Sequence, residues 1–437
     1  MSNQYSSYLR VTPPVLRLGG VKKVTIHARQ KHVLKQLDSV ARILVYPVGS
    51  TVPTAGNLLS VTEVTPFERL DNGDIVFPVE TTIEGAYTVH LSAQKEDGSF
   101  SEIMVIELYA LADDLFDLRP FKGDFHMHSN CSDGKEDPEY VAATCRRTGF
   151  DFMALTDHHK YEPSLRAVKA MADFGCDMLV CPGEEIHLPG NPNHIVNFGG
   201  KGSVNALAKS DEEKYRAEVA GYMKQLPDTG DELARFQVAA SEWTFDRVRD
   251  FGGIAMFCHP FWQPVYHNFI GYAVVDMLFE RNKFDVFEAV GGFYKHQVEC
   301  NMLSISRYCE ERAKGKKLPV AGVSDCHGCD SDLMGWYYTI VFADKLEFDS
   351  IAEAIRDERS VAVHWLPGEH PVVTGPFRLT KFVYFLLREV FPQHDELCAI
   401  EGDIMRRALA GEEPDAVELI AKRKGSVQQY MDSMWEN

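Results

Sequence analysis

The stretch FKGDFHMHSNCSDG, residues 121–134, decides how the rest of this 437-residue sequence is interpreted. Its first part reads as a buried strand that ends in two histidines, His126 and His128. Residues two apart on a β-strand point to the same face, so both imidazoles can reach one ion. The same stretch then supplies a carboxylate, Asp133. We therefore searched the chain for other short buried strands that end in metal-ligand side chains.

Six further segments have this design. Runs of four to eight mostly apolar residues, bounded by Gly, Pro or Asp, favour strands that are covered on both faces, although periodicity alone does not separate them from buried helix. The seven segments are FKGDFHMHS (121–129), DFMALTDHH (151–159), DMLVCPGEEI (177–186), HIVNFGG (194–200), IAMFCHP (254–260), DVFEAV (285–290) and LPVAGVSDCH (318–327). Stretches with helical spacing, such as 138–149 and 164–175, lie between most of them. Alternating strands and helices predict a parallel sheet of the α/β class, and a closed barrel of this kind carries its chemistry at the carboxyl ends of its strands.

Most of these runs end in a histidine, aspartate or glutamate. Any one such residue is more often an ordinary hydrogen-bonded side chain, but their repetition at the same edge of one barrel favours a multinuclear metal site. The candidate ligands are His126, His128, Asp133, His158, Glu185, His194, His259, Asp325 and His327. Two of them have a competing neighbour of the same type, Glu184 beside Glu185 and His159 beside His158.

The ordered series resembles the PHP domain, a family named for polymerase and histidinol phosphatase. The matching motifs are HMHSNCSDG (126–134), LTDHH (155–159), GEEI (183–186), NHIVNFG (193–199), CHP (258–260) and GVSDCHG (322–328). The resemblance implies a distorted seven-stranded β/α barrel that binds three divalent ions, which agrees with the strand count reached from the apolar runs.

The resemblance also implies which ligands share an ion. His126, His128, Glu185 and Asp325 would hold the first metal. Glu185 would bridge to a second metal held with His194 and His259, and Asp133, His158 and His327 would hold a third. Of these residues, Glu185, Asp325 and His259 are the predicted catalytic groups.

Imidazole and carboxylate ligands suit manganese, zinc or iron, and the ligand types alone do not choose among them. A water molecule held by two such ions loses its proton near neutral pH and becomes a nucleophile. Three divalent ions against the three carboxylates of Glu185, Asp133 and Asp325 would leave the site positive, which favours an anionic phosphate. The sequence therefore predicts a metal-dependent phosphoesterase acting through a metal-bridging hydroxide. The alternatives are a metal-dependent amidohydrolase and a non-catalytic metal-binding sensor or adaptor.

Groups that could touch a bound phosphate or protonate a leaving group follow several of the ligands. They are His159, Lys160, His187 and His267. No spacing argument selects one of them.

Three regions are distinguished along the chain. Residues 1–115 contain alternating strand-like runs separated by turns, which predict an immunoglobulin-like β-sandwich. Residues 116–375 are the predicted barrel, with a helical insertion at 201–250 that either covers the site or connects parallel strands. We expect a mixture, in which the helix before His259 is structural and the rest partly covers the site. Residues 376–437 read as a helical extension whose apolar face either packs on the barrel or contacts a second copy of the chain in a homo-oligomer.

Composition limits the partners. The chain has 45 basic and 64 acidic residues, a net charge of −19 with histidine neutral. Such acidity disfavours a groove for duplex nucleic acid and leaves a small phosphorylated metabolite, nucleotide or short oligonucleotide as the expected substrate. No signal peptide or membrane span is recognisable. The ten cysteines are scattered through apparent strands and helices, so reduced thiols and a cytoplasmic location are expected.

Overall fold

The computed structural model describes residues 8–49, 65–264, 267–330 and 333–436. The chain divides into two compact units. One comprises residues 1–119, 380–397 and 425–437, and the other comprises residues 120–379 and 398–424. The segment 376–437, predicted as an extension of its own, thus contributes helices to both units.

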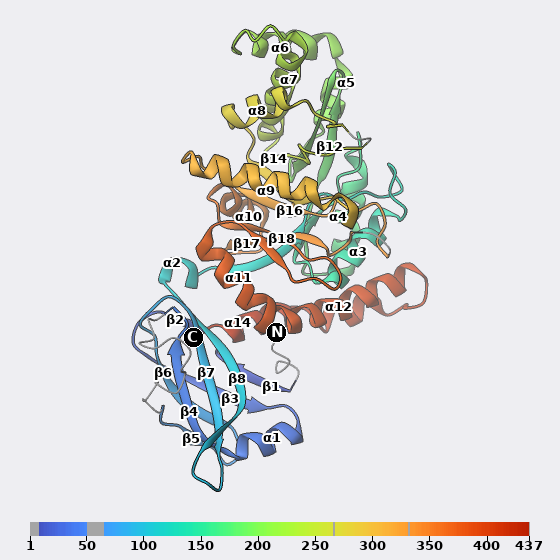
Figure 1. Ribbon diagram of the computed structural model, residues 1–437. Helices are drawn as coiled ribbons and strands as arrows, with labels where there is room; N and C mark the ends of the chain where they lie inside the picture. The colour runs from blue at the N-terminus through green and yellow to red at the C-terminus, as the bar shows by residue number, and fades with distance from the viewer. Residues whose placement is uncertain (1–7, 50–64, 265–266, 331–332, 437) are drawn as a thin grey trace. The chain divides into compact units, whose positions relative to one another are not determined.

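The first unit contains two four-stranded sheets. One has the order β1-β3-β6-β5 and is antiparallel, and the other has the order β2-β8-β7-β4. Apolar side chains from both sheets form one buried cluster that includes Ile26, Phe77, Val89 and Ile106. The strands are β1 (Leu9–Thr12), β2 (Val15–Arg17), β3 (Val21–Ala28), β4 (Val40–Pro47), β5 (Glu68–Arg69), β6 (Ile75–Glu80), β7 (Gly85–Gln94) and β8 (Phe100–Leu111) (Figure 1). The helices that belong wholly to this unit are α1 (Lys31–Asp38), α2 (Asp113–Phe116) and α14 (Ser426–Met434), and most of α11 (Phe377–Glu389) joins them.

The second unit is a mixed α/β structure with two further sheets. A six-stranded sheet has the order β11-β10-β9-β17-β18-β19, and a five-stranded sheet has the order β12-β13-β14-β15-β16. Its strands are β9 (Arg119–Asp124), β10 (Phe152–Ala154), β11 (Leu179–Cys181), β12 (Gly183–Leu188), β13 (Asn191–Phe198), β14 (Ile254–Phe257), β15 (Val286–Gly291), β16 (Val320–Val323), β17 (Tyr337–Ala343), β18 (Ser360–His364) and β19 (Val372–Thr374). Its helices are α3 (Pro138–Thr148), α4 (Glu162–Phe174), α5 (Val204–Ser210), α6 (Glu212–Met223), α7 (Glu232–Asp250), α8 (Tyr272–Arg281), α9 (Val298–Ala313), α10 (Phe348–Arg356) and α13 (Ala416–Ala421), with much of α12 (Phe391–Leu409).

The prediction of a uniformly parallel sheet is wrong for part of this unit. Strands β9, β10 and β11 pair in parallel, as do β14, β15 and β16, but β13 is antiparallel to both β12 and β14. Only two residues separate β12 from β13, which suffices for a hairpin but not for the crossover that parallel strands require. Because β13 and β14 are antiparallel, the helices between them are not a parallel crossover connection either. The antiparallel strands β17, β18 and β19 were not predicted.

Backbone hydrogen bonds join the two sheets where the candidate ligands lie. Beyond the ends of β9 and β16, Met127 forms an isolated β-bridge with Cys326. Beyond the end of β10, His158 forms a second isolated β-bridge with Glu185 of β12. The amide of Asp325 also donates to the carbonyl of His126 over 2.8 Å. The ends of β9, β10, β12 and β16 are thereby held together.

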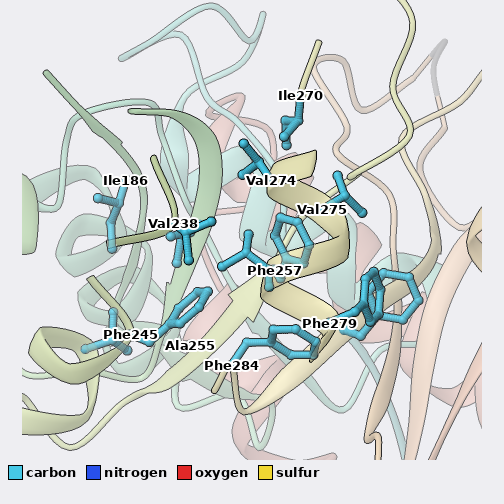
Figure 2. Packing of buried hydrophobic residues seen from close by; sticks show 14 of the residues in the cluster. Ile186, Val238, Phe245, Ala255, Phe257, Ile270, Val274, Val275, Phe279 and Phe284 are labelled. Carbon is cyan, nitrogen blue, oxygen red and sulfur yellow. The ribbon is translucent and has the colours of Figure 1, made fainter. Parts of the chain in front are cut away.

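The helical insertion is anchored in the core of the second unit. Figure 2 shows Val238 and Phe245 of α7 beside Ala255 of β14, with the side chains of α8 close by. The ring of Phe257 lies 5.6 Å from that of Phe284, and both belong to the same buried cluster as Val238. Helix α7 therefore supports the strand that leads to His259, as expected for the helix before this ligand.

Among the described residues, no helix is both long enough and apolar enough to cross a membrane.

Candidate metal centre

Glu185 on β12 lies at the centre of the candidate site, with its side chain fully buried. Its Oε2 atom is 3.4 Å from Nε2 of His126 and 3.4 Å from Nε2 of His128. Asp325 Oδ1 is 3.3 Å from the same atom of His126 and 2.9 Å from that of His128. Ligand bonds of about 2.0–2.1 Å in a tetrahedral site place neighbouring donor atoms about 3.3–3.4 Å apart. The four donor atoms therefore have the spacing of a first coordination shell.

The other oxygen of Glu185 faces a second set of histidines. Oε1 is 2.8 Å from Nδ1 of His194 and 3.6 Å from Nε2 of His259. The two histidine nitrogens are 3.3 Å apart. Glu185 is thus placed to bridge two ion positions, one at each carboxylate oxygen.

The third group surrounds Asp133. Its two carboxylate oxygens lie 3.5 Å from Nε2 of His158 and 3.4 Å from Nε2 of His327. The ring of His128 stacks on both histidines, with centroids 4.3 Å apart in each case. The ligand atoms of these residues all lie within 4.8 Å of one another. All nine ligands chosen from the sequence are therefore found in these three groups.

The geometry separates Glu185 from its neighbour Glu184, which the apolar pattern alone did not. Adjacent residues of a strand point to opposite faces. The buried Glu184 carboxylate accepts hydrogen bonds from Ser203 Oγ at 2.7 Å, the Val204 amide at 2.5 Å and Asn205 Nδ2 at 2.9 Å. These three donors surround the start of α5, so Glu184 holds this helix on β12 instead of facing the histidines.

His158 and His159 are separated in a similar way. Nδ1 of His158 lies 2.7 Å from Glu185 Oε2, while its Nε2 faces Asp133. His159 lies to the side, with its ring centroid 4.6 Å from that of His187. The first histidine of the pair is therefore the one that joins the cluster.

The polar atoms of the site lack the partners that buried polar groups normally have. Neither ring nitrogen of His126 and neither carboxylate oxygen of Glu185 makes a hydrogen bond of acceptable geometry, although these atoms are buried. Leaving such a group unsatisfied costs about 1–3 kcal/mol. Divalent ions between the facing lone pairs would remove this cost, so the residues present fit the metal centre that the resemblance implies.

The histidines of the site differ in pKa. Burial lowers the pKa of His194 to about 4. At His126, His158 and His259 burial lowers the pKa, but nearby carboxylates outweigh it and raise the pKa above its usual value, so these rings would release protons as an ion binds. Burial alone would raise the pKa of Glu185 and Asp325, but neighbouring histidines outweigh it and hold both pKa values well below the usual range. Ionised carboxylates and neutral imidazoles are the forms that bind metal ions.

Two buried acids behind the site were missed by the sequence reasoning. Glu288 Oε2 on β15 is 3.6 Å from Nδ1 of His126. Asp124 accepts hydrogen bonds from the amides of His126 at 3.2 Å and Ser324 at 3.1 Å, and burial raises its pKa to about 7. Glu288 therefore lies behind the ring of His126, where carboxylates commonly orient ligating histidines, whereas Asp124 holds the backbone of this residue. An acidic residue inside an otherwise apolar strand, as in VFEAV, was the available signal.

Asp157 holds the loop that carries Asp133. Its Oδ1 accepts from the amides of Ser129 at 2.9 Å and Ser132 at 3.2 Å, and its Oδ2 accepts from Ser129 Oγ at 2.6 Å. Without this acceptor the buried amide of Ser129 loses its side-chain partner, and the loop is free to move Asp133 away from the histidines.

We expect Asp157→Ala to weaken binding of the ion at the Asp133 group by about 10–100-fold, the usual effect of removing a residue that supports a ligand. Metal equivalents retained after dialysis against a weak chelator measure this directly. Ser132→Ala is the matched control: it removes only the Ser132 hydroxyl, which donates to Asp157 Oδ1 at 2.5 Å, leaves the acceptor in place and should retain more metal. Equal metal retention by wild type and Asp157→Ala would contradict the role of this loop.

Two ligands have strained backbone. His259 has a φ of 26° and Asp325 a φ of 49°. Residues with side chains rarely adopt this left-handed region, and such strain persists only where the surrounding structure enforces it. Both residues directly follow buried strands, β14 and β16, whose packing holds the turn.

An aromatic wall lies beside the second group. The ring of Phe269 is 5.2 Å from that of His194, and the ring of Trp262 is 5.9 Å from that of His259. Trp262 and Phe269 contact each other at 4.9 Å. Trp262 and Phe269 belong to the segment that follows His259, and Tyr266 of the same segment lies outside the described residues.

Comparisons with known proteins bear on the family. No family model matches the sequence. The chain is 34% identical over 95 residues to the DNA polymerase/3'-5' exonuclease PolX of Bacillus subtilis (strain 168), a match that covers 22% of this chain and 16% of that protein. It is similar to a two-domain protein of Bacteroides vulgatus described as containing a PHP-like metal-dependent phosphoesterase, with 18% identity, a TM-score of 0.41, and coverage of 63% of this chain and 71% of the other. The family named for this structure is the one that the sequence motifs resemble.

Two other solved structures match a smaller part of this chain. One is a protein of Bifidobacterium adolescentis named a metal-dependent phosphoesterase, at 18% identity and a TM-score of 0.33. The other is an amidohydrolase from Chromobacterium violaceum with bound sulfate and no metal, at 19% identity and a TM-score of 0.33. Each covers 48% of this chain and 89% of the other.

Proposed function

We propose that this protein is a metal-dependent phosphoesterase that hydrolyses a phosphate ester of a small metabolite, nucleotide or short oligonucleotide at a trinuclear site. The observation that carries the proposal is the buried carboxylate of Glu185, whose Oε2 faces His126 and His128 while its Oε1 faces His194 and His259. A carboxylate between two sets of imidazoles suits two ions a few ångströms apart, as in hydrolases with two-metal sites.

The ligand atoms suggest how the ions would be distributed. His126, His128, Glu185 and Asp325 would hold the first, Glu185, His194 and His259 the second, and Asp133, His158 and His327 the third. Manganese, zinc and iron all suit these ligands. When bound, such ions polarise phosphoryl oxygens and lower the pKa of water.

The chain's own residues have separate roles in this proposal. Glu185 and Asp325 offset part of the positive charge and fix the spacing of the histidines. His259 is held by strained backbone at the edge of the same cluster, 4.0 Å from Asp325 Oδ2. With three carboxylates against three divalent ions the site keeps a net positive charge of about three, which attracts the phosphate group of a substrate.

We also propose that β9, β10, β12, β13, β14, β15 and β16 form one distorted seven-stranded barrel, with residues 116–375 as the catalytic domain. The backbone bridges from Met127 to Cys326 and from His158 to Glu185 support this, since they connect the six-stranded and five-stranded sheets. The two four-stranded sheets around one core support an immunoglobulin-like sandwich for residues 1–115.

Elemental analysis of the purified protein, paired with a phosphatase screen after adding Mn²⁺, tests the function. The screen should contain phosphorylated metabolites, nucleotides, short oligonucleotides and a parallel set of amides, with chelator-treated protein as the control. Two or three metal equivalents with phosphate release are expected. Metal binding with hydrolysis of amides instead of phosphate esters would replace the proposal by an amidohydrolase. Metal binding without any turnover would favour a sensor or adaptor.

A further inference from the structure

A further histidine lies against Glu185, outside the nine ligands chosen from the sequence. Nε2 of His187 is 3.5 Å from Glu185 Oε1, about as far as His259 Nε2 at 3.6 Å. Its ring centroid is 4.0 Å from that of His194. His158, Glu185 and His187 also form a group whose ligand atoms lie within 4.8 Å of one another. Each oxygen of Glu185 therefore faces three histidine nitrogens.

The local backbone directs His187 to this place. Glu185 and His187 are two apart on β12, so their side chains lie on the same face of the strand. The pairing of β12 with β13 shifts register just here, between Ile186 and Leu188. Irregularities of this kind re-aim side chains near active sites. The amide of His187 donates to Asn205 Oδ1 at 3.1 Å, and Asn205 Nδ2 donates to the Glu185 carbonyl at 3.0 Å, so the first helix of the insertion fixes both residues.

We propose that His187 is a fourth protein ligand of the ion held by Glu185 Oε1, His194 and His259. The inference rests on the proposed metal centre and adds to it a residue that the family resemblance does not supply. Three protein ligands leave a tetrahedral ion with a position for water, whereas four close it. By this count the second ion is enclosed by four protein ligands, like the first, and the exchangeable position belongs to the third ion, which Asp133, His158 and His327 would hold.

His187 also has a competing role that the geometry allows. Its Nε2 is 2.8 Å from Nδ1 of His158, within hydrogen-bond distance. In that role His187 would only orient His158, and its loss would weaken binding of the third ion, which Asp133, His158 and His327 would hold. The two roles predict losses at different ions, which makes them separable by metal binding alone.

The test compares Zn²⁺ binding by wild type, His187→Asn and His159→Asn. His159 is the matched control, since it contacts His187 and has a φ of 59°, a conformation that asparagine tolerates. Equivalents retained after dialysis and affinity from competition with a chromophoric chelator are the readouts. We expect His187→Asn to weaken one Zn²⁺ equivalent by at least about tenfold, and His159→Asn to bind as wild type. Thermal unfolding of the metal-free proteins checks that each variant folds, and His187→Gln serves as a second variant.

Repeating the substitution in two backgrounds assigns the ion. In the His158→Ala background, His187→Asn should still weaken Zn²⁺ binding. In the His259→Ala background it should cause no further loss of Zn²⁺ binding, because residues that bind the same ion give non-additive losses. The reverse pattern, or unchanged Zn²⁺ binding by both His187 variants, would overturn the assignment. If wild type binds Zn²⁺ but releases no phosphate from any substrate, the proposed function fails while this inference is still tested. A wild-type protein that binds no metal would overturn both.

Discussion

Replacing Glu185 by glutamine should reduce phosphate release by more than about a hundredfold, because loss of a supporting residue alone already costs 10–100-fold in metal sites. Glu185 is the one side chain that faces both His126 and His194 at distances of 3.4 Å or less among the described residues. A neutral amide cannot offset the charge of two ions, and its NH₂ group presents hydrogens instead of a lone pair. Two metal positions should therefore weaken together. Phosphate release under saturating Mn²⁺ and metal content after dialysis measure the two effects.

Glu184→Gln is the control, since it makes the same chemical change one residue away. Glu184 accepts hydrogen bonds from the α5 end of the insertion and does not face the histidines. We expect this variant to lose stability by about 1–3 kcal/mol but to retain its metal. Full activity in Glu185→Gln, or equal metal loss in both variants, would remove Glu185 from the centre of the site.

The sequence was most informative where strands end. Ligands such as His126 and Asp325 follow short apolar runs, and the carboxyl ends of adjacent strands meet at one edge of a sheet. The chemical identity of these residues was therefore readable without coordinates. The apolar pattern could not decide between Glu184 and Glu185. Adjacent residues of a strand differ only in the face to which they point, and the pattern does not give the register.

His187 illustrates a signal that was present but not used. Glu185 and His187 repeat the spacing of His126 with His128 and of Asp325 with His327. In the sequence, this spacing was interpreted as a ligand pair at His126 and His128, whereas His187 was placed among the groups that could touch phosphate. Its position against Glu185 Oε1 depends on the register shift in β12, which no local pattern predicts.

The antiparallel strands were missed for a different reason. Apolar runs buried on both faces look alike in parallel and antiparallel sheets, so β13 could only be oriented from the length of its connections. The turn between β12 and β13 contains only two residues, which is the feature of the sequence that indicates an antiparallel pair. Strand β17 (YYTIVFA) ends without a metal-ligand side chain, and β18 (SVAVH) ends in His364, which was not singled out in the sequence.

Removing the metal ions should lower the thermal stability of the second unit substantially. An ion that binds only the folded state stabilises it by RT ln(1 + [L]/Kd), which reaches about 4 kcal/mol at a thousandfold excess over Kd. At roughly 2–4 °C per kcal/mol for a unit of this size, chelation should reduce Tm by about 10 °C or more. The effect is expected to be large because both carboxylate oxygens of Glu185 and both ring nitrogens of His126 are buried without an adequate hydrogen-bond partner.

Thermal unfolding of chelated protein, followed by titration with Mn²⁺ or Zn²⁺, measures this coupling. The Tm should rise with the logarithm of metal concentration, and activity should return over the same range if the ions that stabilise the fold are those used in hydrolysis. Glu185→Gln should show a much smaller rise, which separates binding at this centre from adventitious binding at the acidic surface. A Tm that does not respond to saturating metal would mean that the buried lone pairs of Glu185 are satisfied in some other way, and the metal centre would have to be abandoned.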